Sequence, residues 1–134
     1  MSGVFLDSVG LLALWNASDQ WNAAAMAAHR RLMVSDDPLW TTTLILFECG
    51  NRAARQVEFR ALVADFRDEM EAGGSLIVPT PDDERDAWAA YRRGEAGQTG
   101  IVDHVSFVVM RRLGLTRAFT CDAHFRAAGF ETLF

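Results

Sequence analysis

Short apolar runs recur along the chain and are separated by longer segments with helical periodicity. Each run is apolar throughout rather than alternating with polar residues, which is typical of strands buried on both faces of a parallel sheet. The pattern predicts strands at residues 4–6, 39–41, 76–78 and 117–120, with a possible last strand at 131–133.

The segments between these runs carry helix start and stop signals. Asp7 or Ser8 can cap a first helix that runs to about residue 14, and Asp19 can cap a second over residues 20–33. The later helices are expected from a cap among residues 41–43 to about 55, at about 57–72, from 80 to 93, at 101–113 and at 123–128. Alternating strands and helices predict an α/β fold: one domain over residues 1–134, with a central parallel sheet of four to five strands flanked by helices on both faces.

Composition excludes several classes of function. The 134 residues carry 18 acidic and 13 basic side chains, and every basic residue is arginine. The absence of lysine excludes P-loop and Schiff-base mechanisms that need it. The net charge of −5 argues against a broad electrostatic grip on nucleic acid but leaves a nuclease possible, because bound metal would offset clustered acids.

The chain has neither an apolar run of membrane-spanning length nor a signal peptide, so we expect a cytoplasmic protein without membrane contact. Cys49 and Cys121 are isolated thiols with no metal-binding spacing. A cytoplasmic location favours reduced, buried thiols, although a disulfide between them stays open at this point.

Two acids follow directly on predicted strands. Asp7 comes after the first strand, and Asp122 comes just after the strand that ends at Thr120. In open α/β sheets ligands bind beyond the carboxyl ends of the strands, so an acid there more often faces a site than a core. Glu48 and Asp103 lie inside otherwise apolar predicted helices. We expect these four acids to meet and to hold a divalent metal ion.

Glu48 is the most informative of the four, because a carboxylate in an apolar helix is costly unless it is paired or bound to metal. Asn51, Arg52 and Arg55 follow it three, four and seven residues on, and so share its helical face. One reading is a surface ion pair between Glu48 and Arg52, which contributes little to stability. The other is a site in which Asn51 orients metal or substrate and the arginines, with less support, contact RNA phosphate or a protein partner.

Asp103 begins the helix over residues 101–113, and Ser106 lies one turn later on the same face. Asp103 could simply compensate the helix dipole, an alternative that weakens when the four acids are considered together. His104 and His124 neighbour proposed ligands, and adjacent helical residues face different ways, so we expect His104 to point away from Asp103. The spacing of the histidines matches no zinc motif, and their roles stay open.

Taken together, these segments resemble the PIN domain, and specifically the toxins of VapBC-type toxin–antitoxin pairs. The resemblance covers nearly the whole chain, and its specificity comes from the order and spacing of several loose motifs. They occupy residues 5–8, 19–25, 41–48 with Asn51, 101–107 and 120–130.

The resemblance implies a metal-dependent endoribonuclease that cleaves structured RNA such as tRNA or rRNA, with Mg²⁺ or Mn²⁺ as cofactor. It implies an acidic cluster of Asp7, Glu48, Asp103 and Asp122, with Ser8, Asn51, Ser106 and Thr120 in support. A cognate antitoxin and a homodimer are further implications. The sequence departs from relatives at Gln20, Asn22 and His124, the last standing where many carry another acid. A PIN-like module that binds RNA or a partner without efficient cleavage is the alternative.

Overall fold

Five short parallel strands form the centre of the structure, a computed structural model that describes residues 3–134. They are β1 (Val4–Leu6), β2 (Leu39–Thr42), β3 (Leu76–Ile77), β4 (Arg117–Phe119) and β5 (Glu131–Thr132). Their order across the sheet is β3-β2-β1-β4-β5. The central strand β1 pairs with β2 through Val4 opposite Leu39, and with β4 through Phe5 opposite Ala118. The predicted parallel sheet is confirmed, including its fifth strand.

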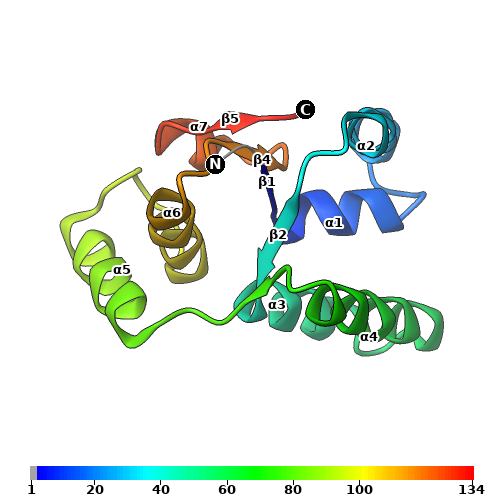
Figure 1. The fold of residues 1–134 in the computed structure, drawn as a ribbon, viewed down its shortest axis with the longest axis horizontal. Helices are drawn as coiled ribbons and strands as arrows, with labels where there is room; N and C mark the ends of the chain where they lie inside the picture. The colour runs from blue at the N-terminus through cyan, green and yellow to red at the C-terminus, as the bar shows by residue number, and fades with distance from the viewer. Residues whose placement is uncertain (1–2) are drawn as a thin grey trace.

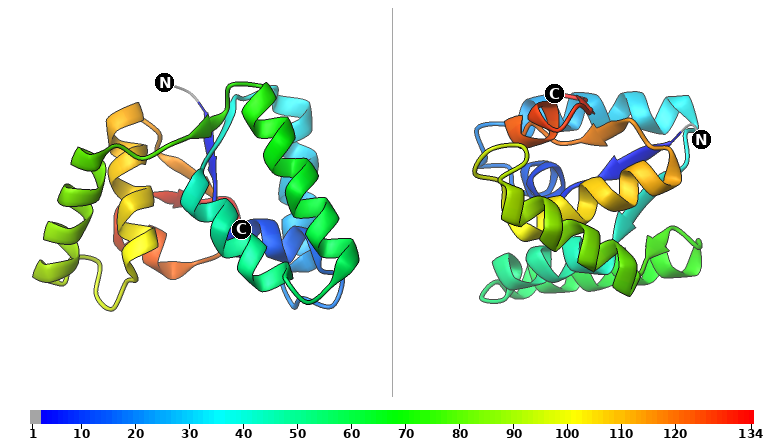
Figure 2. Two further views of the ribbon diagram at one scale, coloured as in Figure 1. Left: turned by 90° about the horizontal axis from the view of Figure 1, so that it is seen from below. Right: turned by 90° about the vertical axis from the view of Figure 1, so that its left-hand side faces the viewer.

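Helices cover the sheet on both sides (Figure 1). The helices α1 and α2 lie on one side, and α5 and α6 lie on the other, while α3 and α4 pack as a pair near the β2–β3 edge (Figures 1 and 2). The bounds are α1 (Ser8–Trp15), α2 (Asn22–Ser35), α3 (Thr43–Ala53), α4 (Val57–Ala72), α5 (Pro81–Arg93), α6 (Ile101–Leu113) and α7 (Ala123–Ala127). Within residues 3–134, no helix is long and apolar enough to cross a membrane.

Aromatic side chains fill the core between the sheet and its helices. Phe5, Phe107, Phe119 and Phe125 are each at most 2% exposed, and Phe107 meets Phe125 edge-on at 4.9 Å between ring centroids. Their burial fixes α6 and α7 against β1 and β4, the strands whose ends carry Asp7 and Asp122. Cys49 is buried as expected, whereas Cys121 is partly exposed, and no disulfide joins the two thiols.

Gly10 allows α1 to lie unusually close to β4. A Cβ at this position would come within 2.0 Å of the Phe119 carbonyl oxygen, a distance that no side chain tolerates. The close approach brings the start of α1 next to the end of β4 and thereby sets Asp7 beside Thr120. A strand-to-helix arrangement of this kind depends on glycine, because only glycine lacks the atom that would clash.

Three predicted helix ends differ from the structure by two residues. The second helix begins at Asn22 rather than at residue 20, so the predicted cap was wrong: Asp19 accepts a hydrogen bond from the Trp21 backbone N–H in the preceding turn. It also ends two residues later than predicted, at Ser35. The third helix ends at Ala53, which places Arg55 in the following turn and not on the helical face of Glu48. Its cap is Thr42, whose hydroxyl accepts from the Ile45 N–H, within the predicted range.

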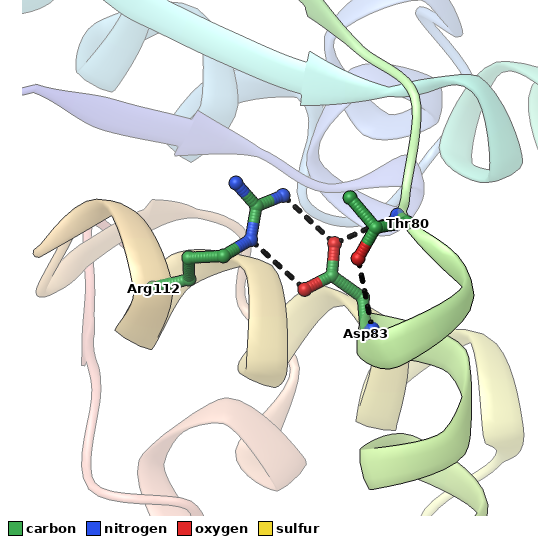
Figure 3. A network of polar contacts seen from close by, with 3 residues as sticks. All are labelled: Thr80, Asp83 and Arg112. Atoms are coloured by element: carbon green, nitrogen blue, oxygen red, sulfur yellow. Dashed lines mark hydrogen bonds and ion pairs between the residues drawn. The ribbon is translucent and has the colours of Figure 1, made fainter.

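A buried acid joins α5 to α6 (Figure 3). The Asp83 carboxylate accepts two hydrogen bonds from the Arg112 guanidinium, at 2.9 and 2.7 Å, and a third from the Thr80 backbone N–H at 2.9 Å. The Thr80 hydroxyl in turn accepts from the Asp83 N–H, which completes a capping box at the start of α5. The fork geometry lowers the pKa of Asp83 and anchors the far end of α6, the helix whose first turn carries Asp103.

Candidate metal centre at the ends of the strands

The carboxyl ends of β1 and β4 lie side by side and open into a hollow of about 410 Å³. We call it the acid hollow. Glu48 reaches it from α3, Asp103 from the first turn of α6, and Asp122 from the residue that caps α7. Its other lining residues are Ser8, Val9, Leu12, Asp19, Asn51 and Arg52. Segments that are more than a hundred residues apart thus contribute acids to one surface depression.

Asp7 is fully buried and lies near the acids of the hollow, although its own side chain does not line it. Its Oδ2 accepts a hydrogen bond from the Thr120 hydroxyl at 2.8 Å. Its Oδ1 is also shielded from solvent and has no hydrogen-bond partner among residues 3–134. Burial, together with repulsion from Asp103, Asp122 and Glu48, raises the pKa of Asp7 to about 8. A buried carboxylate oxygen without a partner is costly, and a cation is one way to satisfy it.

Thr120 connects the two strand ends. Its hydroxyl donates to Asp7 and accepts from the Asp122 backbone N–H at 3.1 Å. Asp122 Oδ1 in turn accepts from the His124 N–H at 2.9 Å, so that its carboxylate is oriented by the start of α7. The threonine hydroxyl therefore fixes the spacing between the buried acid and the acid that lines the hollow.

Asp103, Asp122 and His124 offer three potential metal-ligand atoms that lie within 4.8 Å of one another. The pKa of Asp103 is raised to about 6 by burial first, and then by the negative charges of Asp122 and Glu48. Carboxylate oxygens suit hard divalent cations, which would relieve both the mutual repulsion and the unpaired Asp7 Oδ1. The residues present therefore fit a Mg²⁺ or Mn²⁺ ion.

Glu48 accepts a hydrogen bond from the Ser8 hydroxyl at 2.9 Å. No ion pair joins it to Arg52 within the described part of the chain, so the simple surface pair considered from the sequence is not formed. Arg52 and Asn51 instead line the acid hollow. Arg55 does not line it, because α3 ends before this residue. The prediction that these residues share the helical face of Glu48 thus holds for Asn51 and Arg52, and it is wrong for Arg55.

Two further side chains of α6, Ser106 and His104, have partners other than the acids. The Ser106 hydroxyl donates to the Val102 carbonyl at 3.1 Å, one turn earlier in its own helix, so its hydrogen is not directed at Asp103. His104 is 3% exposed and packs edge-on against Tyr91 and Phe107. Burial lowers the pKa of His104, as expected for an imidazole in an apolar environment. It points away from Asp103, as predicted.

Sequence reasoning missed Asp19 at the site and left the role of His124 open. Asp19 lines the acid hollow, although the sequence suggested only a helix cap. His124 is part of the potential ligand group, and its Nδ1 lies 3.1 Å from Asp122 Oδ1. The available signal was its position two residues after Asp122, in the first turn of the short helix that this carboxylate caps. For Asp19 no local signal was available, because its placement depends on how α2 follows α1.

Comparisons with known proteins concern the family and the fold of the chain. The PIN domain family matches residues 4–131. Two relatives, both described as the 23S rRNA-specific endonuclease VapC20 and from two strains of Mycobacterium tuberculosis, are 32% identical over 128 residues. The match covers 95% of this chain and 95% of each relative.

A similar fold has also been solved experimentally. The crystal structure of VapC20 from Mycobacterium tuberculosis, described as a sarcin–ricin loop cleaving toxin, matches with a TM-score of 0.78 and 29% identity. The match covers 96% of both chains. Since the family match, the sequence relatives and the structural neighbour agree over nearly the whole length, the chain belongs to the PIN domain family.

Proposed function

We propose that this chain is a Mg²⁺- or Mn²⁺-dependent endoribonuclease that acts as the toxin of a toxin–antitoxin pair. The observation that carries the proposal is the buried Oδ1 of Asp7, which has no hydrogen-bond partner among residues 3–134 and lies near Asp103 and Asp122. Structural carboxylates are normally satisfied by hydrogen bonds or arginine, whereas this one is surrounded by other acids. Relatedness to endonucleases of the same fold supports the assignment to RNA hydrolysis.

The four acids share one task in this proposal. Asp7, Glu48, Asp103 and Asp122 would hold the cation directly or through water, and His124 is an additional candidate ligand. The bound ion would supply positive charge that acidifies a water molecule and offsets charge on the scissile phosphate. Thr120 and Ser8 would orient Asp7 and Glu48, to which their hydroxyls donate. Arg52 and Asn51 would contact the RNA backbone from the rim of the hollow, a role for which Arg55 is less well placed.

The substrate class we propose is a structured ribosomal RNA loop. The relatives are named for 23S rRNA, and the solved neighbour is described as cleaving the sarcin–ricin loop. Loops present unstacked bases and an accessible backbone, which a shallow site on a small protein can reach more easily than a regular helix. The proposal places the protein in the cytoplasm, where ribosomal RNA is found.

Cleavage of a sarcin–ricin loop RNA by wild-type protein and by Asp7→Asn, with Mg²⁺ or Mn²⁺, tests the proposal. We expect wild type to cut at a defined position and Asp7→Asn to be slower by more than about a hundredfold, beyond the loss typical of residues that only support a ligand. Equal rates for the two proteins, or no cut by either, would refute it. Titration of Mn²⁺ by calorimetry separates an enzyme that binds metal from a PIN-like binding module.

We also propose a cognate antitoxin and a homodimer as partners. The side chains that support protein contacts are large, apolar and exposed: Phe47 on α3, Val57 on α4, and Trp88 and Tyr91 on α5. Light scattering of the purified chain measures its oligomeric state. Co-expression with the product of a small neighbouring reading frame, followed by the cleavage assay, should show a stable complex with suppressed activity.

A further inference from the structure

A second, smaller depression adjoins the acid hollow. We call it the side pocket. It has a volume of about 130 Å³ and is lined by Trp15 and Asn16 at the end of α1, and by Gln56 and Phe59 at the start of α4. It shares Leu12, Asp19 and Arg52 with the acid hollow, so the two depressions are adjacent. A ligand bound at the acids needs to cross only these shared residues to reach the side pocket.

The walls of the side pocket combine aromatic rings with carboxamides. Trp15 and Phe59 are both partly buried, and Trp15 is held by an edge-on contact with Phe66 at 5.3 Å between ring centroids. Aromatic walls of this kind stack on bases of unpaired RNA. A fixed ring loses little entropy on binding, which makes it a better wall than a mobile one.

The polar groups of the side pocket match the edges of a base. Asn16 and Gln56 each carry a carbonyl acceptor and an NH₂ donor, the groups that read donor and acceptor patterns on nucleobases. Asn16 Oδ1 accepts from the Ser18 N–H at 3.0 Å, which orients the side chain and directs its NH₂ group elsewhere. Gln56 is exposed at the N-cap position of α4 and makes no side-chain capping bond, so its carboxamide is available to a ligand.

Arg52 lies at the boundary between the two depressions. Its guanidinium can meet a phosphate oxygen while the acids act on the same or the neighbouring phosphate. In a nucleotide, a single sugar separates the base from its phosphate. The side pocket shares lining residues with the acid hollow, so a base there could belong to the nucleotide whose phosphate lies at the acids. From this arrangement we infer that the side pocket binds one unstacked nucleobase next to the scissile phosphate, an inference that rests on the proposed nuclease function.

The test is an abasic scan of binding. Full-length Asp7→Asn protein serves as the cleavage-silent background, and its neutral amide resembles the protonated carboxyl that a pKa of about 8 favours. Single-stranded RNAs with the sarcin–ricin loop sequence, each lacking one base, are titrated and their dissociation constants measured. We expect one position at which removal of the base weakens binding on the order of tenfold, the effect of one stacked base.

The same titrations are repeated with Gln56→Ala and with Phe59→Leu, each added to Asp7→Asn. Gln56 is exposed and Phe59→Leu keeps apolar volume, so both variants should fold. In each variant, removal of the base at the sensitive position should change the dissociation constant by less than about twofold, because the pocket lacks either its aromatic wall or its carboxamide. Gln98→Ala is the matched control: it removes an exposed glutamine from the loop before α6 and should keep the full tenfold effect.

Two results would overturn the inference. One is a scan without any sensitive position, as expected if the side pocket holds only water or a side chain of a protein partner. The other is a sensitive position that keeps its effect in both variants, which would place the base elsewhere. Cleavage by wild type is measured separately, so loss of the nuclease proposal and loss of the base pocket give different outcomes.

Discussion

Two buried carboxylates in this protein have opposite environments. Asp7 is fully buried and Asp83 is 3% exposed, yet burial and neighbouring acids raise the pKa of Asp7 to about 8, whereas Arg112 lowers that of Asp83. Asp83 accepts from a guanidinium and from the Thr80 backbone N–H, which holds α5 and α6 together (Figure 3). Asp7 has one hydroxyl donor and otherwise faces acids.

The contrast separates a carboxylate that stabilises the fold from one that is held for a ligand. A buried charge that is paired with a bidentate arginine is compatible with stability. A buried carboxyl without a counter-ion is destabilising in its charged form, and such groups cluster at functional sites. Burial alone therefore does not identify a site residue, but burial without compensation does point to one.

The largest expected effect is on stability in the absence of metal. Since the folded-state pKa of Asp7 lies above its ordinary value, unfolding releases a proton as the pH rises from about 4 toward 8, and the folded state loses stability over that range. Asp7→Asn should remove this loss and raise the free energy of unfolding at pH 7 on the order of 2–4 kcal/mol.

Urea denaturation at several pH values, in EDTA, measures this effect. The wild type and Asp7→Asn should converge well below the ordinary pKa of 3.8, where the carboxyl is protonated in both states. Asp83→Asn is the matched control, and it should lower the free energy of unfolding at pH 7 where Asp7→Asn raises it. Added Mn²⁺ should stabilise wild type more than Asp7→Asn, because only wild type retains the full ligand set. A destabilised Asp7→Asn would contradict our reading of the site.

Thr120→Val tests whether the hydroxyl between the two strand ends orients the acids. The substitution keeps the shape of the side chain but removes the donor to Asp7 and the acceptor for the Asp122 N–H. We expect RNA cleavage to fall about 10- to 100-fold, as for other residues that support metal ligands. Thr116→Val, at the exposed residue before β4, is the control and should cleave normally. Normal cleavage by Thr120→Val would assign the hydroxyl a purely structural role.

Arg112→Met tests the compensated carboxylate. It leaves Asp83 buried without its counter-ion, and because the arginine side chain is 43% exposed we expect a modest loss of about 1–2 kcal/mol in unfolding free energy at pH 7. The pKa of Asp83 is lowered in the fold, so the stabilisation exists above its ordinary pKa and is lost as the pH falls through the folded-state value. The difference from wild type should therefore shrink in acid, which urea titration can show. A difference that stays constant with pH would contradict an ionic origin.

Ser8→Ala should have the smallest effect. The hydroxyl donates to Glu48 Oε1 at the edge of the acid hollow, and one such bond contributes about 1 kcal/mol or less to stability. We expect a few-fold decrease in cleavage, because Glu48 keeps its charge and its helix. Ser18→Ala, in the exposed turn before α2, is the control for thermal melting and cleavage. A loss of cleavage as large as that of Thr120→Val would contradict this expectation and give the Ser8 hydroxyl the same importance as that of Thr120.

The sequence by itself determined the parallel sheet, because short apolar runs such as Val4–Leu6 leave a strand no exposed face. It also indicated that Asp7 and Asp122 follow strand ends, and that Glu48 interrupts an apolar helix. It could not fix the ends of α2 and α3, since capping and fraying there depend on packing against other elements. Asp19 and Arg55 were misjudged for this reason.

Only the tertiary structure decided which acids are compensated. Local sequence gives Asp83 and Asp7 similar roles, each next to a helix start, but Arg112 lies 29 residues from Asp83 and Thr120 lies 113 residues from Asp7. The close approach of α1 to β4 at Gly10 and the junction of the two depressions at Arg52 likewise depend on distant segments. Charge compensation acts over a few ångströms in space, and the sequence does not specify which residues come that close.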